Sequence, residues 1–378
     1  MRIKEMFGIE GCIGRKIFVI IVAVTVIMSS VAMVSPVSVD AAASKKKASV
    51  VKIGKATVTT SNGKVVVSKK NKVITIKKSG TYTLKGNFAS YRILMNSRKL
   101  NVVLRLNGVT MKNSKTACIY NTKKSANLNI QLVKGTKNNL TGPAAFPVVL
   151  QKTGGNKVVP DAVVMSDGNL SFSGSGNFNV KDVSSNGNAI DSKKDIKISS
   201  GDIYVVSKNN GLNGDNVIIN GGDLSVSSSD TGIKASQKVS VNAGSVDIDA
   251  VDKGIQGRMG VDIKNGTVSI KTRRKVGSGF EDFRGIAAGR SDKNGKQAVA
   301  ASINISGGKL TISSYGDCIH ASQNVNINGG TLNLTSTTDD GIQAKQTVTI
   351  KSSVKISISA KGKKIKADKK NIASNIKV

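Results

Sequence analysis

The sequence contains no tryptophan, and aromatic residues make up only 3% of its 378 residues. Proteins that bind flat crystalline polysaccharides normally present a row of exposed aromatic rings, so this scarcity disfavours that class of ligand. One histidine and three cysteines are too few for a structural zinc site or a disulfide framework. The stability of the fold must therefore come from packing or from another metal.

Acidic residues are also scarce: 23 Asp and Glu stand against 57 Lys and Arg, for a net charge of +34. Such a field attracts polyanions at long range, and outside a cell these include teichoic acids, uronate-rich polysaccharides, mucin glycans and released DNA. No aromatic-basic module such as RNP1 is present, so no specific nucleic-acid partner is expected. The alternative is that the charge serves solubility alone.

The N-terminus has the features of a secretory signal peptide. An apolar run from Ile17 to Met28 follows four basic residues, and small residues around Ala41 to Ala43 offer cleavage sites. The run is shorter than the roughly 20 apolar residues of a bilayer span, which disfavours a permanent anchor. We therefore expect residues 1–43 to be removed and the protein to be secreted, extracellular or associated with the cell wall. Without them the net charge is +33, and Cys118 and Cys318 are the remaining cysteines.

One pattern of alternating apolar and polar residues recurs from Asn186 almost to the C-terminus. Each repeat has two short alternating segments joined by a turn, often Gly-Gly or Asn-Gly, whose glycines supply positive φ. Alternation at a fixed spacing predicts stacked coils of about 22 residues in an all-β parallel β-helix. An antiparallel sandwich would also alternate, but its turns would not recur at this spacing. Seven coils share the pattern: DIKISSGDIYVVS, NVIINGGDLSVSS, KVSVNAGSVDIDA, GVDIKNGTVSIKT, SINISGGKLTISS, NVNINGGTLNLTS and TVTIKSSVKISIS.

The repeat also predicts which side chains stack inside the coils. Ile196/Ile198 and Ile203/Val205 should lie beneath Val217/Ile219 and Leu224/Val226, and then beneath Val239/Val241 and Val246/Ile248. One interior stack is expected to contain Ile196, Ile219, Val241, Ile263, Ile305 and Ile327. A second corner is marked by a recurring apolar residue: Ile190, Leu212, Ile233, Ile255, Ile286, Ile319, Ile342 and Ile365.

The spacing of these corners divides the chain into segments. The corner steps lengthen between residues 255 and 319, which predicts an inserted loop at 273–301. Residues 186–367 should form regular coils, residues 75–185 irregular coils, and residues 44–74 a basic segment that is partly disordered or caps the stack. Residues 368–378 should form a tail. Each coil contacts only its neighbours, and we expect a monomer.

Several strings in serial order carry a family resemblance: LRLNGVTM, ACIYN, LVKGTKNNLTG, LSFSGSGNFNV, and the corners GIKAS, GDCIHAS and DDGIQAK. Over roughly residues 75 to 350 the chain resembles the secreted carbohydrate-binding, polysaccharide-lyase-like β-helix family of Gram-positive anaerobes. The resemblance implies a right-handed single-stranded parallel β-helix, calcium sites at corner carboxylates, and binding of plant-type polysaccharides without demonstrated cleavage. The sequence departs from the family at corners that are acidic there, with Asn209, Asn210, Lys253 and Arg284 here.

Corner carboxylates form two columns in this stack. Asp230 and Asp252 fall in adjacent coils, with Asn209, Asn210, Asn213 and Asp215 as further oxygen donors, and Asp317 falls beneath Asp339 and Asp340. Adjacent coils lie about 4.8 Å apart, so these like charges repel unless a cation intervenes. Ca²⁺ prefers such oxygens, and the sequence predicts calcium sites of unknown number. The alternative is that the abundant lysines pair with the carboxylates. Glu281 and Asp282 in the insertion are further candidates.

The leading function is a non-catalytic, calcium-stabilised extracellular polysaccharide binder that favours acidic polymers such as polygalacturonate. A calcium-dependent pectate-type lyase is the alternative, since Lys253, Arg284 or Lys345 could act as the base beside a corner carboxylate. A second alternative is a structural wall or adhesion protein that adheres to teichoic acid. His320, two residues after Cys318, is expected to be a corner packing residue rather than a metal ligand.

Overall fold

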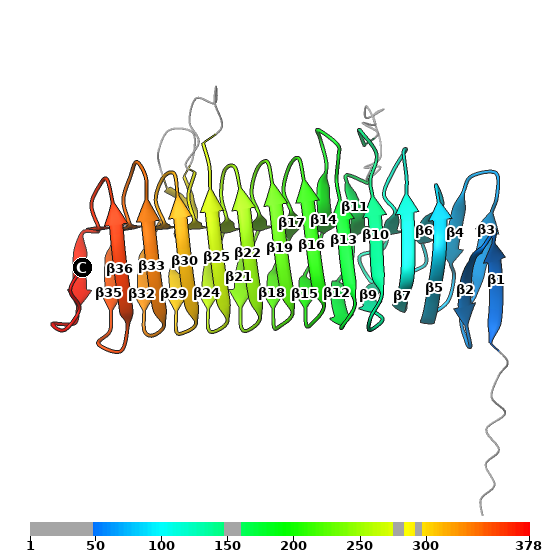
Figure 1. Ribbon diagram of the computed structural model, residues 1–378, viewed down its shortest axis with the longest axis horizontal. Helices are drawn as coiled ribbons and strands as arrows, with labels where there is room; N and C mark the ends of the chain where they lie inside the picture. Colours follow the sequence, from blue (N-terminus) through cyan, green and yellow to red (C-terminus); the bar gives the residue numbers. More distant parts are fainter. Residues whose placement is uncertain (1–47, 147–159, 275–282, 292–296) are drawn as a thin grey trace, which may run out of the picture. The chain divides into compact units, whose positions relative to one another are not determined.

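A computed structural model describes residues 48–146, 160–274, 283–291 and 297–378, and the predicted signal peptide lies outside these ranges. Within them the chain is all-β, without helices, and forms a parallel β-solenoid of about 12 turns with about 23 residues per turn. Figure 1 shows the coils side by side in chain order, from β1 at the blue end to β38 at the red end. The predicted β-helix is confirmed.

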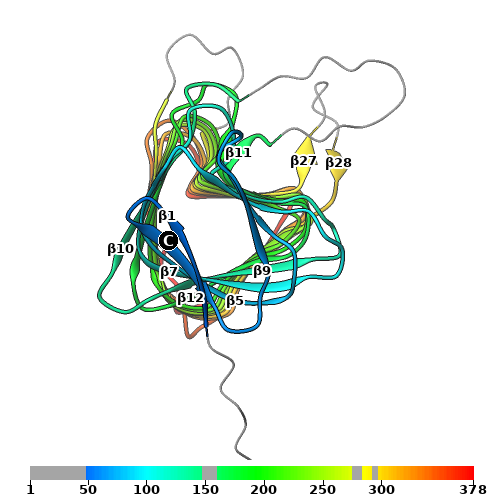
Figure 2. The same ribbon diagram turned by 90° about the vertical axis from the view of Figure 1, so that its right-hand side faces the viewer.

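Three ladders of parallel strands make up the coils, and Figure 2 shows them superposed along the stack. Ladder 1 contains β9 (Asn127–Leu132), β12 (Leu170–Gly174), β15 (Ile196–Ile198), β18 (Val217–Ile219), β21 (Lys238–Val241), β24 (Gly260–Ile263), β29 (Ile303–Ile305), β32 (Asn324–Ile327), β35 (Thr347–Ile350) and β38 (Lys369–Ile372). Ladder 2 contains β10 (Lys137–Thr141), β13 (Asn177–Lys181), β16 (Asp202–Ser207), β19 (Asp223–Ser228), β22 (Ser245–Ala250), β25 (Thr267–Thr272), β30 (Lys309–Ser314), β33 (Thr331–Ser336) and β36 (Lys355–Ala360).

Ladder 3 forms a sheet of its own, in which most strands have three residues. It contains β4 (Val73–Ile76), β6 (Arg92–Met95), β8 (Ile119–Asn121), β11 (Ala162–Ser166), β14 (Asn188–Ser192), β17 (Leu212–Gly214), β20 (Ile233–Ala235), β23 (Ile255–Gly257), β26 (Ile286–Ala288), β31 (Ile319–Ala321), β34 (Ile342–Ala344) and β37 (Ile365–Lys366). The recurring residues predicted to mark a corner are the buried residues of these strands.

The register inside the stack follows the predicted layers with one correction. Ile196/Ile198 pair with Val217/Ile219, and these pair with Val239/Val241. Because Ile196 lies opposite Val217, it belongs to the stack next to that of Ile219, and Ile198 takes the predicted place. The error is one alternation of two residues along the strand, which keeps the side chain inside the core. The whole series is buried, so the apolar interior runs through all coils.

The two ends of the solenoid differ. At the N-terminal end β1 (Ser49–Ile53) pairs antiparallel with β2 (Ala56–Thr60), β2 pairs antiparallel with β5 (Gly80–Ala89), and β3 (Val65–Ser68) pairs antiparallel with β4. The long strand β7 (Asn101–Lys112) then pairs with both β9 and β10, so it spans ladders 1 and 2. At the other end β38 pairs with β35, so part of the expected tail 368–378 is a strand of the last coil.

The insertion differs from the single loop predicted at 273–301. β26 lies inside that range and pairs with β23 and β31, so the chain returns to ladder 3 between two excursions. A short antiparallel pair, β27 (Arg290–Ser291) and β28 (Gln297–Val299), follows it and projects from the coils in Figure 2. Glu281 and Asp282 lie outside the described residues. Ile286 pairs with Ile255 and Ile319, so ladder 3 stays continuous although the connections on either side of β26 are longer.

Two further findings concern the cysteines and the membrane. Cys118 and Cys318 are free and buried, as the lack of a disulfide framework requires. Among the residues that the structure describes, no helix is long and apolar enough to cross a bilayer.

Turn glycines allow neighbouring coils to approach closely. Gly222 has a φ of +82°, and a Cβ there would lie 2.6 Å from the carbonyl oxygen of Gly201 in the preceding coil. Gly108 has a φ of +71°, with nothing within 4 Å of the same position. Positive φ disfavours any L side chain at both sites, but only Gly222 also faces a backbone clash.

We expect Gly222→Ala to lower the free energy of unfolding by roughly 2 kcal/mol more than Gly108→Ala. The matched pair separates the clash from the cost of positive φ, which both variants share. Urea unfolding followed by circular dichroism measures both. Equal losses would show that the coils do not approach as closely as the structure indicates.

Candidate functional site

The outward side chains of ladder 3 form a continuous line along the stack. In the strands of three residues the first and third are buried inside and the middle one faces outward, as in the segment Ile319, His320, Ala321. We call these middle residues, together with the residues of the other strands that pair in register with them, the outer column. In register it comprises Leu94, Tyr120, Met165, Asp191, Asn213, Lys234, Gln256, Ala287, His320, Gln343 and Lys366.

The outer column changes character along its length. Leu94, Tyr120 and Met165 belong to an apolar cluster separate from the main core. From Asp191 onward the column is polar or charged except at Ala287. Adjacent coils lie about 4.8 Å apart, so successive groups of the column have the same spacing. An extended ligand chain that lies along the column would therefore contact several coils.

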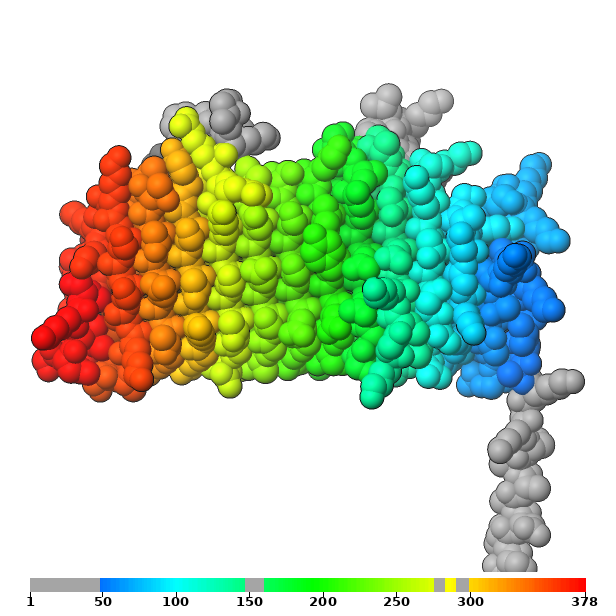
Figure 3. Space-filling view, in the orientation of Figure 1, coloured from blue at the N-terminus to red at the C-terminus, as the bar shows by residue number. Residues whose placement is uncertain are grey.

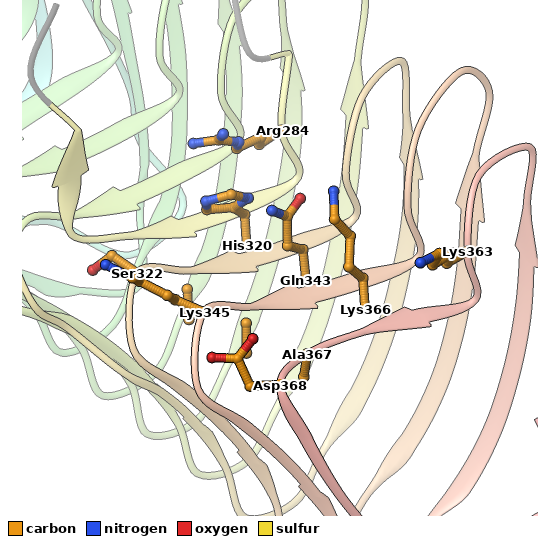
Figure 4. A pocket seen from close by; sticks show the side chains of 11 residues that line it. Arg284, His320, Ser322, Gln343, Lys345, Lys363, Lys366, Ala367 and Asp368 are labelled. Carbon is orange, nitrogen blue, oxygen red and sulfur yellow. The ribbon is translucent and has the colours of Figure 1, made fainter. Parts of the chain in front are cut away.

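A hollow with a volume of about 610 Å³ lies at the C-terminal end of this face, and we call it the basic hollow. Figure 4 shows His320, Gln343 and Lys366 in a row, with Arg284 above His320 and with Lys345 and Asp368 at the neighbouring turn. Five of its side chains are cationic or basic and one is acidic. The full lining is Arg284, His320, Ala321, Ser322, Gln343, Ala344, Lys345, Lys363, Lys366, Ala367 and Asp368.

A smaller hollow of about 390 Å³ lies on the same face in the central coils. Lys234 and Gln256 of the outer column line it together with Asn213 and Arg258. Its side chains are amides and cations, which donate hydrogen bonds to hydroxyl or carboxylate oxygens. The two hollows therefore offer the same chemistry at two places on the outer column.

The predicted cluster Asp317, Asp339 and Asp340 comes together at the edge of the basic hollow. One carboxylate oxygen from each lies within 4.8 Å of the others. Asp317 and Asp340 are buried, and the backbone N–H of Asp340 donates to Oδ1 of Asp317 at 3.1 Å. Burial, followed by the charges of Asp317 and Asp340, raises the pKa of Asp339. The three carboxylates repel one another unless cations lie beside them.

The chain itself places basic side chains beside two of these carboxylates. Nδ1 of His320 lies 2.7 Å from Oδ2 of Asp317, and Nε of Arg284 lies 3.7 Å from the same oxygen. Nζ of Lys366 forms an ion pair with Oδ2 of Asp340 at 3.3 Å. Ca²⁺ needs six to eight oxygens, which the three carboxylates, backbone carbonyls and water would supply. It would compete with Lys366 for Asp340, and calcium binding here stays a prediction.

The second predicted column is only partly assembled. Asp230 and Asp252 line a hollow of about 330 Å³ with Asn209, and Nζ of Lys253 lies 2.9 and 2.7 Å from the two carboxylate oxygens of Asp252. Burial is the main cause that raises the pKa of Asp230, and the charge of Asp252 adds to it. Lys253 therefore neutralises Asp252, and a metal would have to compete with it for this carboxylate.

Three other predicted ligands make hydrogen bonds of their own. Asn209 precedes β17, whereas Asp215 follows it at the other end of the strand. There Asp215 accepts a hydrogen bond from Oγ of Ser236 at 2.6 Å. Asn210 is buried and donates to Asn188 at 2.9 Å. Asn213 faces outward and donates to Oδ2 of Asp191 at 2.6 Å. They were grouped from sequence proximity, but successive residues of a β-solenoid corner face different directions.

A third acidic cluster was not predicted from the sequence. Nζ of Lys193 lies 3.1 Å from Oδ1 of the fully buried Asp191 and 3.9 Å from Oδ2 of Asp161. Asp167 is also buried, and its Oδ1 has no hydrogen-bond partner. Burial raises the pKa of Asp161 and of Asp167. The available signal was the position of Asp191 between Ile190 and Ser192, which matches the middle position of the later ladder 3 strands.

The candidate bases of a lyase are divided between two places. Arg284 and Lys345 line the basic hollow, whereas Lys253 lies beside Asp252, which lines another hollow. The prediction that His320 is a corner packing residue is wrong, because its ring contacts Asp317 and lines the hollow. Burial raises the pKa of the Cys318 thiol to about 11, so a Cys-His metal pair is disfavoured.

Together the coils and the outer column define a class of protein: a parallel β-solenoid that presents amide and cationic side chains along one sheet. The chain belongs to the family of carbohydrate-binding domain-containing proteins, whose model matches residues 70–340. The carbohydrate-binding family predicted from the motifs is thereby confirmed, whereas secretion and a Gram-positive origin stay predictions. Membership supports carbohydrate binding.

Among solved structures, the polysaccharide lyase-like protein from C. thermocellum, determined as a gadolinium derivative, is similar to this chain. The two share 23% sequence identity with a TM-score of 0.40, over 82% of this chain and 90% of that one. A search of curated proteins gives no match.

The raised pKa of Asp167 predicts a pH effect on stability. A carboxyl group whose pKa is higher in the folded state favours folding when protonated, and this contribution is lost as pH rises through the raised pKa. At pH 7 the buried charge therefore destabilises the fold, and we expect Asp167→Asn to raise the melting temperature. The gain should disappear below about pH 4, where both states are protonated. Exposed Asp223→Asn is the control, and an equal gain there would contradict the assignment.

The competition between Lys366 and calcium is also testable. Ca²⁺ that binds only the folded state raises the melting temperature, and the rise should be larger in Lys366→Gln because no lysine has to leave Asp340. Exposed Lys361→Gln should behave like the unaltered protein. If calcium shifts melting in none of the three proteins, the cluster is held by side-chain cations alone and the calcium prediction is wrong.

Proposed function

We propose that the protein is an extracellular, non-catalytic binder of acidic polysaccharides, which lie along the outer column and enter the basic hollow. The observation that supports this most directly is the lining of that hollow, in which Arg284, His320, Lys345, Lys363 and Lys366 accompany a single acidic side chain, Asp368. Family membership supports a carbohydrate as the ligand, and the positive charge of the protein supports an acidic carbohydrate.

The chemistry of the hollow suits carboxylated sugars. Lysine and arginine nitrogens donate charge-assisted hydrogen bonds to carboxylates, while the amide of Gln343 serves both as donor and acceptor for hydroxyl groups. Tyr204 is the one aromatic among the exposed large hydrophobic residues of the described chain, and it is 47% exposed. Recognition by a row of stacked rings is therefore disfavoured, as the sequence predicts.

The absence of catalysis is also a proposal. A pectate-type lyase needs a metal against the uronate carboxylate and a base free to take the neighbouring proton. Arg284 is 18% exposed and lies 3.7 Å from Asp317, which lowers its availability as a base. Lys345 is exposed and lines the same hollow, and this observation keeps a lyase as the second candidate. A structural wall protein would need the charge but not the hollow.

We expect Lys345→Gln to weaken binding of polygalacturonate about tenfold, because one charge-assisted contact contributes about 1.4 kcal/mol or more. Exposed Lys351→Gln removes the same charge outside the hollow and should change affinity less than about twofold. Affinity should fall with added salt, since exposed charges are screened beyond about 8 Å at physiological ionic strength. Calorimetry at two salt concentrations measures both, and equal effects of the two variants would remove the hollow from the binding site.

Incubation with polygalacturonate and calcium should release no unsaturated ends that absorb in the ultraviolet. A non-catalytic binder produces no such ends at any protein concentration. Product that is lost in Lys345→Gln but not in Lys351→Gln would overturn the proposal in favour of the lyase.

A further inference from the structure

The positive charge is concentrated in the N-terminal coils. Residues 41–160 contain 24 Lys and Arg and no Asp or Glu, whereas residues 161–378 contain 29 basic and 20 acidic residues. The first segment therefore contributes +24 to the chain's net +34. Carboxylates and the cations that neutralise them are confined to the later coils.

The described part of this acid-free segment runs from β1 to β10, the blue to green strands of Figure 1. Nearly all of its basic side chains are exposed, and no carboxylate within the segment can pair with them. The exposed set is Lys52, Lys55, Lys64, Lys69, Lys70, Lys72, Lys77, Lys78, Lys85, Arg98, Lys99, Arg105, Lys112, Lys115, Lys124, Lys134 and Lys137.

So many exposed like charges raise the free energy of the compact fold through repulsion. Solubility alone does not require that they be segregated, because acidic residues are interspersed among the basic ones in the later coils. The arrangement is accounted for if a polyanion neutralises this part of the protein.

The distribution of the charges indicates the kind of polyanion. Lys85 of β5 and Arg105 of β7 point outward from ladder 1, Lys77 follows β4 of ladder 3, and Lys112 ends β7 beside ladder 2. A flat membrane touches one side of a stack, and so would leave much of this charge unused. A flexible polymer that surrounds the coils reaches all of it.

The types of side chain narrow the choice further. Most of the exposed cations are lysines, which act as hydrated point charges rather than as planar bidentate forks. Val50 and Val66 are the exposed large hydrophobic residues of the described segment, so it offers no exposed aromatic ring for a sugar or a base. The surface therefore recognises charge density, and a polyol phosphate chain carries charge without rings that need recognition.

We infer that the acid-free coils β1 to β10 form a docking surface for a flexible phosphodiester polymer of the polyol phosphate type. It is separate from the basic hollow, which lies in the C-terminal coils. Such a polymer would hold the protein in place while the outer column remains open to a polysaccharide.

The probe is poly(glycerol phosphate), and the test compares two variants with the same loss of charge. Lys55, Lys85, Lys112 and Lys134 are exposed residues of the acid-free coils, and Lys197, Lys309, Lys351 and Lys355 are exposed residues of the later coils. In each variant all four lysines are replaced by glutamine. The first should bind the polymer at least tenfold more weakly and the second less than threefold.

The dependence of affinity on salt provides a second measurement, because its slope reports the number of phosphates that cations neutralise. The slope should fall in the first variant and not in the second, and Lys→Arg at the same four positions should restore the affinity. Circular dichroism and sedimentation verify that each variant is folded and has the same oligomeric state as the unaltered protein.

Equal losses in the two glutamine variants would assign binding to the field of the whole molecule and overturn the inference. So would stronger binding to phosphatidylglycerol vesicles or to single-stranded DNA than to the polymer. Lys345→Gln, which tests the polysaccharide site, should leave polymer affinity within twofold, so the two proposals fail independently.

Discussion

The structure depends on the stacking of apolar side chains in register along parallel ladders. Each interior position, such as Ile198, Ile219 and Val241, lies above its equivalent in the preceding coil, and the hydrogen bonds of the ladders fix this spacing. Figure 3 shows the same regularity on the surface, where successive coils form parallel bands of atoms. Because burial and register are coupled, a side chain outside the core is repeated as regularly as one inside it.

Because of this regularity, like charges at equivalent corners of adjacent coils lie close together and must be neutralised. Equivalent carboxylates in adjacent coils are brought together whether or not their charges agree. Lys193, Lys253 and Lys366 each lie beside such a carboxylate, so the later coils carry internal neutralisation. The earlier coils have no carboxylates, and their repulsion is left for an external anion. The same backbone repeat thus carries internal ion pairs in the later coils and uncompensated positive charge in the earlier ones.

The repeat in the sequence was enough to predict the fold class, the layers and most of the register, because alternation and turn glycines recur together. Ile196 was misplaced by two residues, since the shift keeps the same face and so leaves no trace in the apolar pattern. The site was harder to predict. The cluster of Asp317, Asp339 and Asp340 was found because its members occupy equivalent corners, whereas Asp215 was grouped wrongly by proximity in sequence. His320 and Gln343 were missed as an outward pair because strands of three residues show too little alternation.

The unlike ends of the solenoid bear on how copies of the protein meet. Antiparallel pairing of β1, β2 and β5 turns the ladder back on itself at one end. At the other end, no described strand pairs with the far edges of β36, β37 and β38. An open edge is a template on which another chain can continue a sheet. Lys355, Lys369 and Lys370 stand in these final strands and are exposed. The acid-free coils at the other end are also basic, so repulsion between the unlike ends of two copies disfavours head-to-tail growth into fibrils. The charge that we propose to draw in polyanions therefore also opposes this pairing.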